Sequence, residues 1–179
     1  MPDGIVTAHA DRTLLFRPSK GREQKIRMLA RATVMLACHG PQKIVFRLLV
    51  GDAKGSVHLF SLPELNLIES HDLGKSSVTA LALHEPSGRK RVIAGLQDGG
   101  IYALGEGVPS GSLKLFSLEG SVGLIHSTDE ILTVYSGWTR EVRHWNGDAV
   151  SPAKRWFKPP STPIRRVSQQ LILPKAVRA

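Results

Sequence analysis

A pattern of apolar and turn-forming residues recurs through this chain at an almost fixed interval, and that interval restricts the possible folds more than any other feature. The stretch GDAKGSVHLF, which begins at Gly51, matches stretches that begin at Ala8, Gly95 and Ser136. The successive steps are 43, 44 and 41 residues. The sixth residue after each start is apolar and favours β-strands: Leu14, Val57, Ile101 and Val142. A period of this length indicates stacked, equivalent units.

A second marker agrees with the first. The segments VMLACHG, VTALALHEPSG and VGLIHSTDE begin at Val34, Val78 and Val122, with two steps of 44 residues. Two independent markers in register predict that the repeat is a property of the fold.

Each unit has the alternating pattern and turn residues of four short strands. In the third unit we expect strands over 78–83, 91–94, 101–104 and 113–116, with a tight turn at 98–100 where glycine can supply positive φ. The second unit predicts strands over 34–37, 46–50, 57–60 and 67–69, and the fourth over 122–126, 131–135, 142–145 and 155–157. Residues 4–29 look like a unit that lacks its first strand.

A period of about 40 to 45 residues with four strands per unit resembles the WD40 β-propeller family, here across residues 4–158. VTALALHEPSG resembles the first strand and turn of that family, and GLQDGGIYAL and GDAKGSVHLF resemble its next hairpin. The Trp-Asp pair of the family is replaced by Phe60-Ser61, Leu104-Gly105 and Trp145-Asn146. Of the buried polar network of the family, Trp145 and Thr133 fill two places, whereas Arg140 stands where the turn aspartate is expected. The resemblance implies an all-β fold, a propeller with about four WD40-like, four-stranded blades in this chain.

The expected organisation is a series of blades over 1–160, at about 1–30, 31–73, 74–118 and 119–160, followed by a basic tail over 161–179. The missing strand of the first blade leaves three solutions open. The tail supplies it from 164–167 or 171–173 and closes a small ring, another chain completes a larger or shared ring, or the sequence is a piece of a longer polypeptide. We favour completion by another chain, a second copy or a different subunit, slightly over closure by the tail.

Composition indicates an intracellular protein. The longest apolar runs are far shorter than the roughly 20 residues that cross a bilayer, so we expect no membrane span. A single cysteine, Cys38, excludes an internal disulfide and suits a reducing compartment, the cytoplasm or nucleus.

Positive charge is concentrated at the two ends of the chain. The net charge is +9, of which residues 149–179 contribute +7 with no acidic residue, and residues 1–31 contribute +4, whereas residues 32–148 contribute −2. If the tail completes the first blade, the two basic segments become neighbours and form one positive patch.

Motifs for chemistry are absent from the sequence. The hairpin glycines lack the spacing of a phosphate-binding loop, the seven histidines lack metal-ligand spacing, and there is no nucleophile elbow. The adjacent acids Asp129 and Glu130 would point to opposite faces of a strand. We therefore expect no enzyme activity, no metal and no cofactor.

The expected function is that of a non-catalytic interaction scaffold, a propeller subunit of a multi-protein assembly. Trp138, in a hairpin turn and flanked by Arg140, is the predicted anchor for a protein partner. The alternative is an RNA-associated or other nucleic-acid-associated subunit, whose basic end segments bind phosphate. For the tail, this alternative names Lys154, Arg155, Lys158, Arg165, Arg166, Lys175 and Arg178. A solvated extension and an anchor in a partner complex are the other interpretations of the tail.

Overall fold

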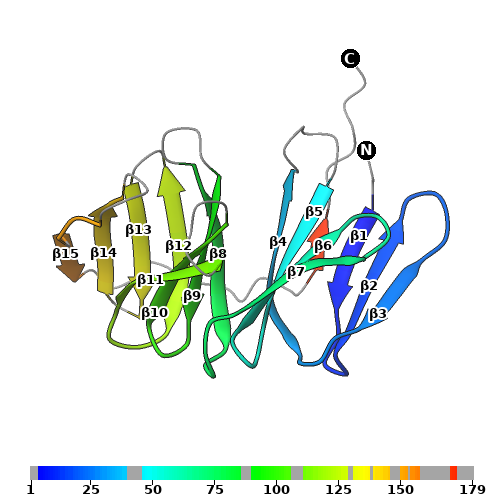
Figure 1. Ribbon diagram of the computed structural model, residues 1–179, viewed down its shortest axis with the longest axis horizontal. Helices are drawn as coiled ribbons and strands as arrows, with labels where there is room; N and C mark the ends of the chain where they lie inside the picture. Colours follow the sequence, from blue (N-terminus) through cyan, green and yellow to red (C-terminus); the bar gives the residue numbers. More distant parts are fainter. Residues whose placement is uncertain are drawn as a thin grey trace, which may run out of the picture.

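The protein folds into four antiparallel sheets of four strands each (Figure 1). The computed structural model describes residues 4–39, 46–85, 90–105, 111–128, 131–137, 139–145, 150–152, 154–157 and 170–172. At 39, 46, 154–157 and 170–172 it describes the backbone alone.

The sheets are named A to D in chain order, and the strands of each sheet are named from the inner strand to the outer one. Sheet A consists of β16 (Gln170–Ile172), β1 (Gly4–Ala8), β2 (Thr13–Pro18) and β3 (Gln24–Arg27). Sheet B consists of β4 (Ala32–His39), β5 (Phe46–Asp52), β6 (Ser56–Ser61) and β7 (Leu67–Asp72). Sheet C consists of β8 (Val78–His84), β9 (Arg91–Leu96), β10 (Gly100–Leu104) and β11 (Ser112–Ser117). Sheet D consists of β12 (Val122–Thr128), β13 (Ile131–Ser136), β14 (Thr139–His144) and β15 (Lys154–Phe157).

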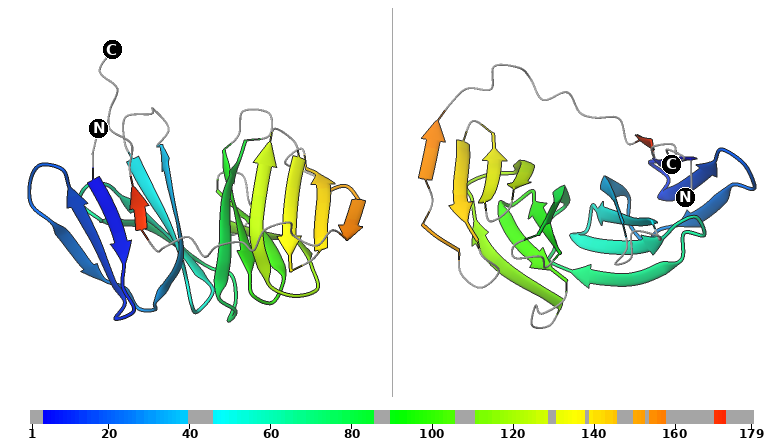
Figure 2. Two further views of the ribbon diagram at one scale, coloured as in Figure 1. Left: turned by 180° about the vertical axis from the view of Figure 1, so that it is seen from behind. Right: turned by 90° about the horizontal axis from the view of Figure 1, so that it is seen from above.

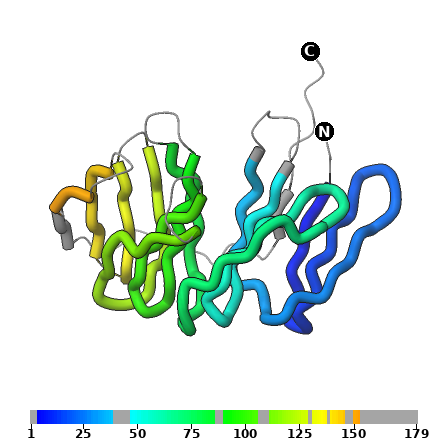
Figure 3. The backbone as a smooth tube through the Cα atoms, in the orientation of Figure 1, coloured from blue at the N-terminus to red at the C-terminus, as the bar shows by residue number. Residues whose placement is uncertain are grey.

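The four sheets follow one another around an arc, as blades do in a propeller (Figure 2, right). Sheets A and D are the two ends of this arc (Figure 2). The smooth course of the backbone shows the successive up-and-down strands of sheets B and C (Figure 3). The predicted all-β, propeller-like architecture is confirmed.

Most predicted strands are confirmed, with ends that differ by at most three residues. In the third unit the sequence predicts strands over 78–83, 91–94, 101–104 and 113–116, and the structure has Val78–His84, Arg91–Leu96, Gly100–Leu104 and Ser112–Ser117. The prediction over 142–145 is displaced, because β14 begins at Thr139 and ends at His144. Residues 164–167 lie outside the described residues, but the structure does contain a tail strand, at 170–172.

That tail strand occupies the place of the missing first strand of sheet A. β16 pairs antiparallel with β1, with Ile5 opposite Ile172 and Thr7 opposite Gln170 (the red strand beside the dark blue one in Figure 1). In the other three sheets this inner position is filled by the strand that begins the unit. The chain therefore completes its first blade with residues about 165 positions downstream, a separation that follows from the paired residue numbers.

Apolar side chains between neighbouring sheets form three cores. One joins sheets A and B around Phe16, Leu48 and Phe60, one joins B and C around Val57, Val78 and Leu96, and one joins C and D around Ile101, Leu132 and Trp145. Burial of this apolar surface between the sheets is the main favourable contribution to the arc.

Glycine permits the close approach of the sheets at two equivalent positions. A Cβ atom on Gly51 would lie 2.5 Å from Cγ1 of Val78, and one on Gly95 would lie 2.4 Å from Cγ1 of Val122. Each glycine thus accepts a valine from the inner strand of the next sheet. The residue across the hairpin from each glycine, Val57 or Ile101, is almost fully buried in the same interface.

The single cysteine yields a pH prediction. Cys38 lies on β4 among the partly buried residues between sheets B and C, and burial raises the pKa of its thiol, against a smaller lowering by Arg47 and Lys90. Because the folded pKa lies above the unfolded one, the contribution of Cys38 to stability is fully present below the unfolded pKa, about 8.5, and is lost as pH rises through the folded value. We expect slower alkylation by iodoacetamide in the folded protein than in urea at pH 8.5. The urea midpoint should also fall from pH 8 to 10 less in Cys38→Ala than in the native chain, and equal falls would contradict this.

Candidate partner-binding surface

Sheet D carries one face that none of the other described sheets covers (Figure 2). Its other face packs on sheet C through Ile125, Leu132 and Val134. Strand alternation and pairing place a second set of side chains on the first of these faces, which we call the end face of sheet D: Leu124, His126, Thr128, Ile131, Thr133, Tyr135, Arg140, Val142 and His144. Of these, Thr133 is buried within the sheet. Three of them form a row across neighbouring strands, since Leu124 lies opposite Tyr135, and Tyr135 lies opposite Arg140.

The end face exposes both charge and apolar surface. Arg140 and His144 are exposed, and Leu124 is 47% exposed, although it is a large apolar residue. On the strands of sheet D the single acidic residue is Glu141. It is buried on the opposite face, so the described end face is basic and partly apolar.

The end face differs from the interior faces at the positions that seat a neighbouring blade. In sheets B and C, the pairing of the first two strands contains a register shift, and the first pair beyond it includes Gly51 or Gly95. In sheet D the equivalent residue is Tyr135. Across the next hairpin, Arg140 corresponds to the buried Val57 and Ile101. A further blade would therefore meet Tyr135 and Arg140 where the interior interfaces have a glycine and an apolar residue.

This correspondence corrects the sequence alignment of the fourth unit. The repeat pattern matches Ser136 with Gly51 and Val142 with Val57, whereas the strand register matches Tyr135 and Arg140. The reason is the length of the hairpin: the segment between the paired residues Tyr135 and Arg140 is one residue shorter than the segment between Gly51 and Val57.

The predicted site residues fall in different places. Arg140 lies on the end face and is exposed to solvent, whereas Trp138 lies outside the described residues. Lys154 and Arg155 belong to β15, where their backbones pair with Val142 and Glu141. The other five tail residues lie outside the described residues: Lys158, Arg165, Arg166, Lys175 and Arg178.

An ion pair that sequence reasoning missed lies in the interface behind the end face. Glu141, 1% exposed, accepts hydrogen bonds from Nε and Nη2 of Arg143 at 3.2 and 3.0 Å. The Arg143 guanidinium also lies 4.2 Å from the ring centre of Phe116 on sheet C. The i, i+2 spacing of opposite charges on one strand is the signal that could have predicted this pair, because such residues share a face.

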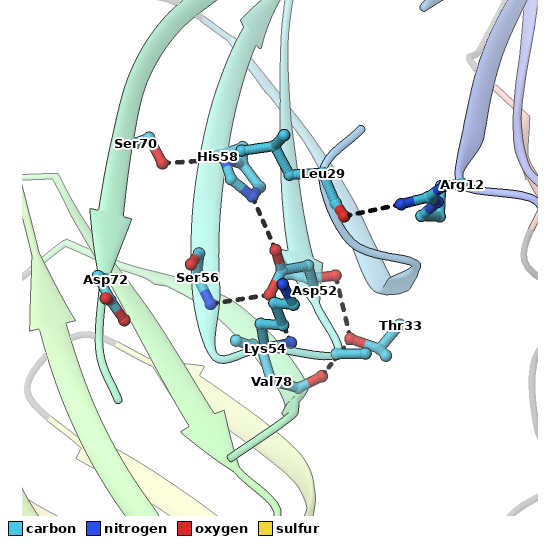
Figure 4. Close-up of polar contacts among 12 residues, drawn as sticks. Arg12, Leu29, Thr33, Asp52, Lys54, Ser56, His58, Ser70, Asp72 and Val78 are labelled. Atoms are coloured by element: carbon cyan, nitrogen blue, oxygen red, sulfur yellow. Dashed lines mark hydrogen bonds and ion pairs between the residues drawn. The ribbon is translucent and has the colours of Figure 1, made fainter. Parts of the chain in front are cut away.

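A polar cluster holds the central hairpin of sheet B (Figure 4). Oδ1 of the buried Asp52 accepts hydrogen bonds from the backbone N–H groups of Lys54 and Ser56 at 2.8 and 2.9 Å. Its Oδ2 lies 3.1 Å from Nε2 of His58, whose Nδ1 lies 2.9 Å from the hydroxyl of Ser70. Since Asp52 satisfies turn donors as well as the imidazole, this row of three side chains orders the turn.

Between sheets C and D, Trp145 is fully buried. Its ring stacks on His84 with a centroid distance of 5.0 Å and an interplanar angle of 16°. The guanidinium of Arg91, itself 4% exposed, lies 5.4 Å from the ring centre of Trp145. This cluster joins the two sheets that support the end face.

Over the described ranges, no group of three or more His, Cys, Asp or Glu side chains has the geometry of a metal site. Within the same residues, no helix is long and apolar enough to cross a membrane.

Comparisons with known proteins show the fold. No protein-family model and no curated protein sequence matches the chain. Among solved structures it is similar to a computationally designed protein, Ika8, with a TM-score of 0.66 and 18% identity over 86% of this chain and 47% of the designed one. It is also similar to U3-55K, a propeller, with a TM-score of 0.65 and 15% identity over 83% of this chain and 47% of that one. The chain thus spans about half the length of the structures it matches.

Proposed function

We propose that this chain is a non-catalytic interaction scaffold with WD40-like repeats, which serves a multi-protein assembly through the end face of sheet D. The observation that carries the proposal is the row of Leu124, Tyr135 and Arg140, which lies on the face that none of the other described sheets covers (Figure 2). Tyrosine and arginine are enriched among the residues that dominate binding energy at protein interfaces. Trp138, two residues before Arg140 in the sequence, is proposed to be part of the same anchor.

A different protein suits this face better than a second copy of the chain. A head-to-tail second copy would bring the uncovered face of its sheet A, with the exposed Arg17, Lys25 and Arg27, against Arg140. Like charges facing each other across an interface are unfavourable. Of the two ways in which another chain could complete the ring, we therefore favour a different subunit over a second copy of this chain.

The test compares two charge reversals in nuclease-treated extract from the source cells. Arg140→Glu, alone and with Trp138→Ala, should weaken the recovery of stoichiometric protein partners by about 30-fold or more if these residues are dominant contacts. Lys114→Glu on the exposed strand β11 is the matched control and should leave recovery unchanged. Equal recovery with all variants, or loss of the partners on nuclease treatment alone, would contradict the proposal.

A further inference from the structure

At the opposite end of the arc, basic residues are gathered on one hairpin. Residues 12–31 hold seven cationic side chains and one acidic one, Glu23, so their net charge is 7 − 1 = +6. All seven are exposed: Arg12, Arg17, Lys20, Arg22, Lys25, Arg27 and Arg31. The segment forms β2, β3 and their flanking turns, the outer half of sheet A.

Strand register directs three of these cations away from sheet B. Lys25 lies opposite Leu15, whereas the alternate residues Leu14 and Phe16 are buried in the core between sheets A and B. Arg17 and Arg27 share the face of Lys25 by the same alternation. Lys25 and Arg27 are two residues apart on one strand, which separates them by about 6.8 Å.

A hollow lies beside these cations. Lys25 and Arg27 line a hollow of about 410 Å³ together with Asp11, Thr13 and Ile26. The Asp11 carboxylate accepts a hydrogen bond from the backbone N–H of Thr13 at 3.0 Å, and this bond lowers the pKa of Asp11. One carboxylate at the rim leaves the surroundings strongly positive, because residues 11–31 together still carry +5.

The C-terminal tail also contributes a strand to this sheet. β16 pairs with β1, but its three residues, Gln170–Ile172, carry no charge. Of the seven basic residues over 149–179, Lys154 and Arg155 belong to sheet D and the other five lie outside the described residues, so the described positive charge of sheet A comes from the β2–β3 hairpin.

We propose that the β2–β3 hairpin of sheet A binds the phosphate backbone of nucleic acid. A row of exposed cations on an extended strand matches a regularly spaced polyanion, and lysine and arginine contacts to phosphate need no base-specific groups. The aromatic side chain of this hairpin, Phe16, is buried and is not available to stack on bases, so contacts to phosphate carry the binding. An acidic protein partner is disfavoured, because protein interfaces are built around an apolar centre, whereas the exposed positions of these strands are cationic.

The experiment measures anisotropy of a labelled 20-nucleotide RNA of mixed sequence, single-stranded or as a duplex, with the full chain in 50 to 200 mM salt. Loss of two phosphate contacts lowers the salt slope by about 1.4 for a single strand. Between 50 and 200 mM salt the dissociation constant of the native protein should therefore rise about sevenfold more than that of Lys25→Gln/Arg27→Gln. Lys54→Gln/Lys114→Gln removes the same charge from exposed positions of sheets B and C and should keep the native slope. Thermal melts confirm that each variant folds.

Four outcomes would overturn the proposal. The first two are equal salt slopes for Lys25→Gln/Arg27→Gln and Lys54→Gln/Lys114→Gln, and no measurable binding of either RNA. The other two are binding of poly-glutamate as tight as that of RNA, and loss of all binding in Arg165→Gln/Arg166→Gln while Lys25→Gln/Arg27→Gln binds as the native chain does. The site is separate from the proposed protein-binding face on sheet D, so each proposal can fail without the other.

Discussion

Trp145→Ala should lower the melting temperature by about 6 to 20 °C. The side chain is fully buried between sheets C and D, and truncation of such a residue costs about 3–5 kcal/mol through lost burial and the cavity that remains. For a chain of this size, each kcal/mol corresponds to about 2–4 °C. The variant also removes the ring on which His84 stacks and over which the buried Arg91 guanidinium lies.

Trp145→Phe is the matched control, because it keeps an aromatic ring in the cluster. In the part of the chain that the structure describes, the indole N–H of Trp145 has no hydrogen-bond partner, so the phenyl ring leaves no acceptor unpaired. Leu124→Ala, on the end face of sheet D, should change the melting temperature little, since this side chain is 47% exposed. A melting temperature for Trp145→Ala within 2 °C of the native value would contradict the assigned packing.

The repeat was sufficient to predict the sheets because strand alternation and turn residues are local properties. At the turn between β9 and β10, for example, Gly99 has φ of 90° and the N–H of Gly100 donates to the Asp98 carboxylate at 3.0 Å. This is the tight turn that the glycines predict. The pattern also indicated that the first blade lacks a strand, because each of the other three units contains four predicted strands.

The fourth unit shows where pattern matching fails. Arg140 and Val142 lie two residues apart on β14 and therefore point to the same face. An alignment that seeks an apolar residue selects Val142, although the hydrogen-bond register assigns the place to Arg140. Interior blades need an apolar residue there because the next sheet covers it, and this requirement is absent at the end of the arc.

Contacts between blades were beyond the reach of the sequence. His84 and Trp145 are 61 residues apart, and His84 Nε2 lies 3.1 Å from the carbonyl oxygen of Trp145. Nothing in the sequence around either residue marks it as half of an interface. The same holds for the uncovered faces of sheets A and D, since only the arrangement of the sheets separates a buried face from an exposed one.

Leu171→Pro should destabilise sheet A selectively. Proline at this position removes a backbone donor from β16, the strand that closes the inner edge of the sheet by pairing with β1. A backbone group left unpaired costs about 1–3 kcal/mol, and the open edge would expose the core around Val6 and Phe16, both of which are fully buried. We expect the amides of β1 and β2 to lose hydrogen-exchange protection while those of sheets C and D keep it.

The control is Ala176→Pro, a proline in the same tail, four residues beyond the end of β16. It should leave exchange in sheet A unchanged, which separates the loss of the strand from a general effect of proline on the tail. Equal protection of β1 in both variants would show that β16 does not hold the first blade together. Because that blade carries the basic hairpin, the Leu171→Pro variant should also bind RNA more weakly than Ala176→Pro, with a smaller salt slope. The closing strand would then be a condition for nucleic-acid binding at one end of the arc, while protein binding on sheet D, supported by the separate C–D core, would persist.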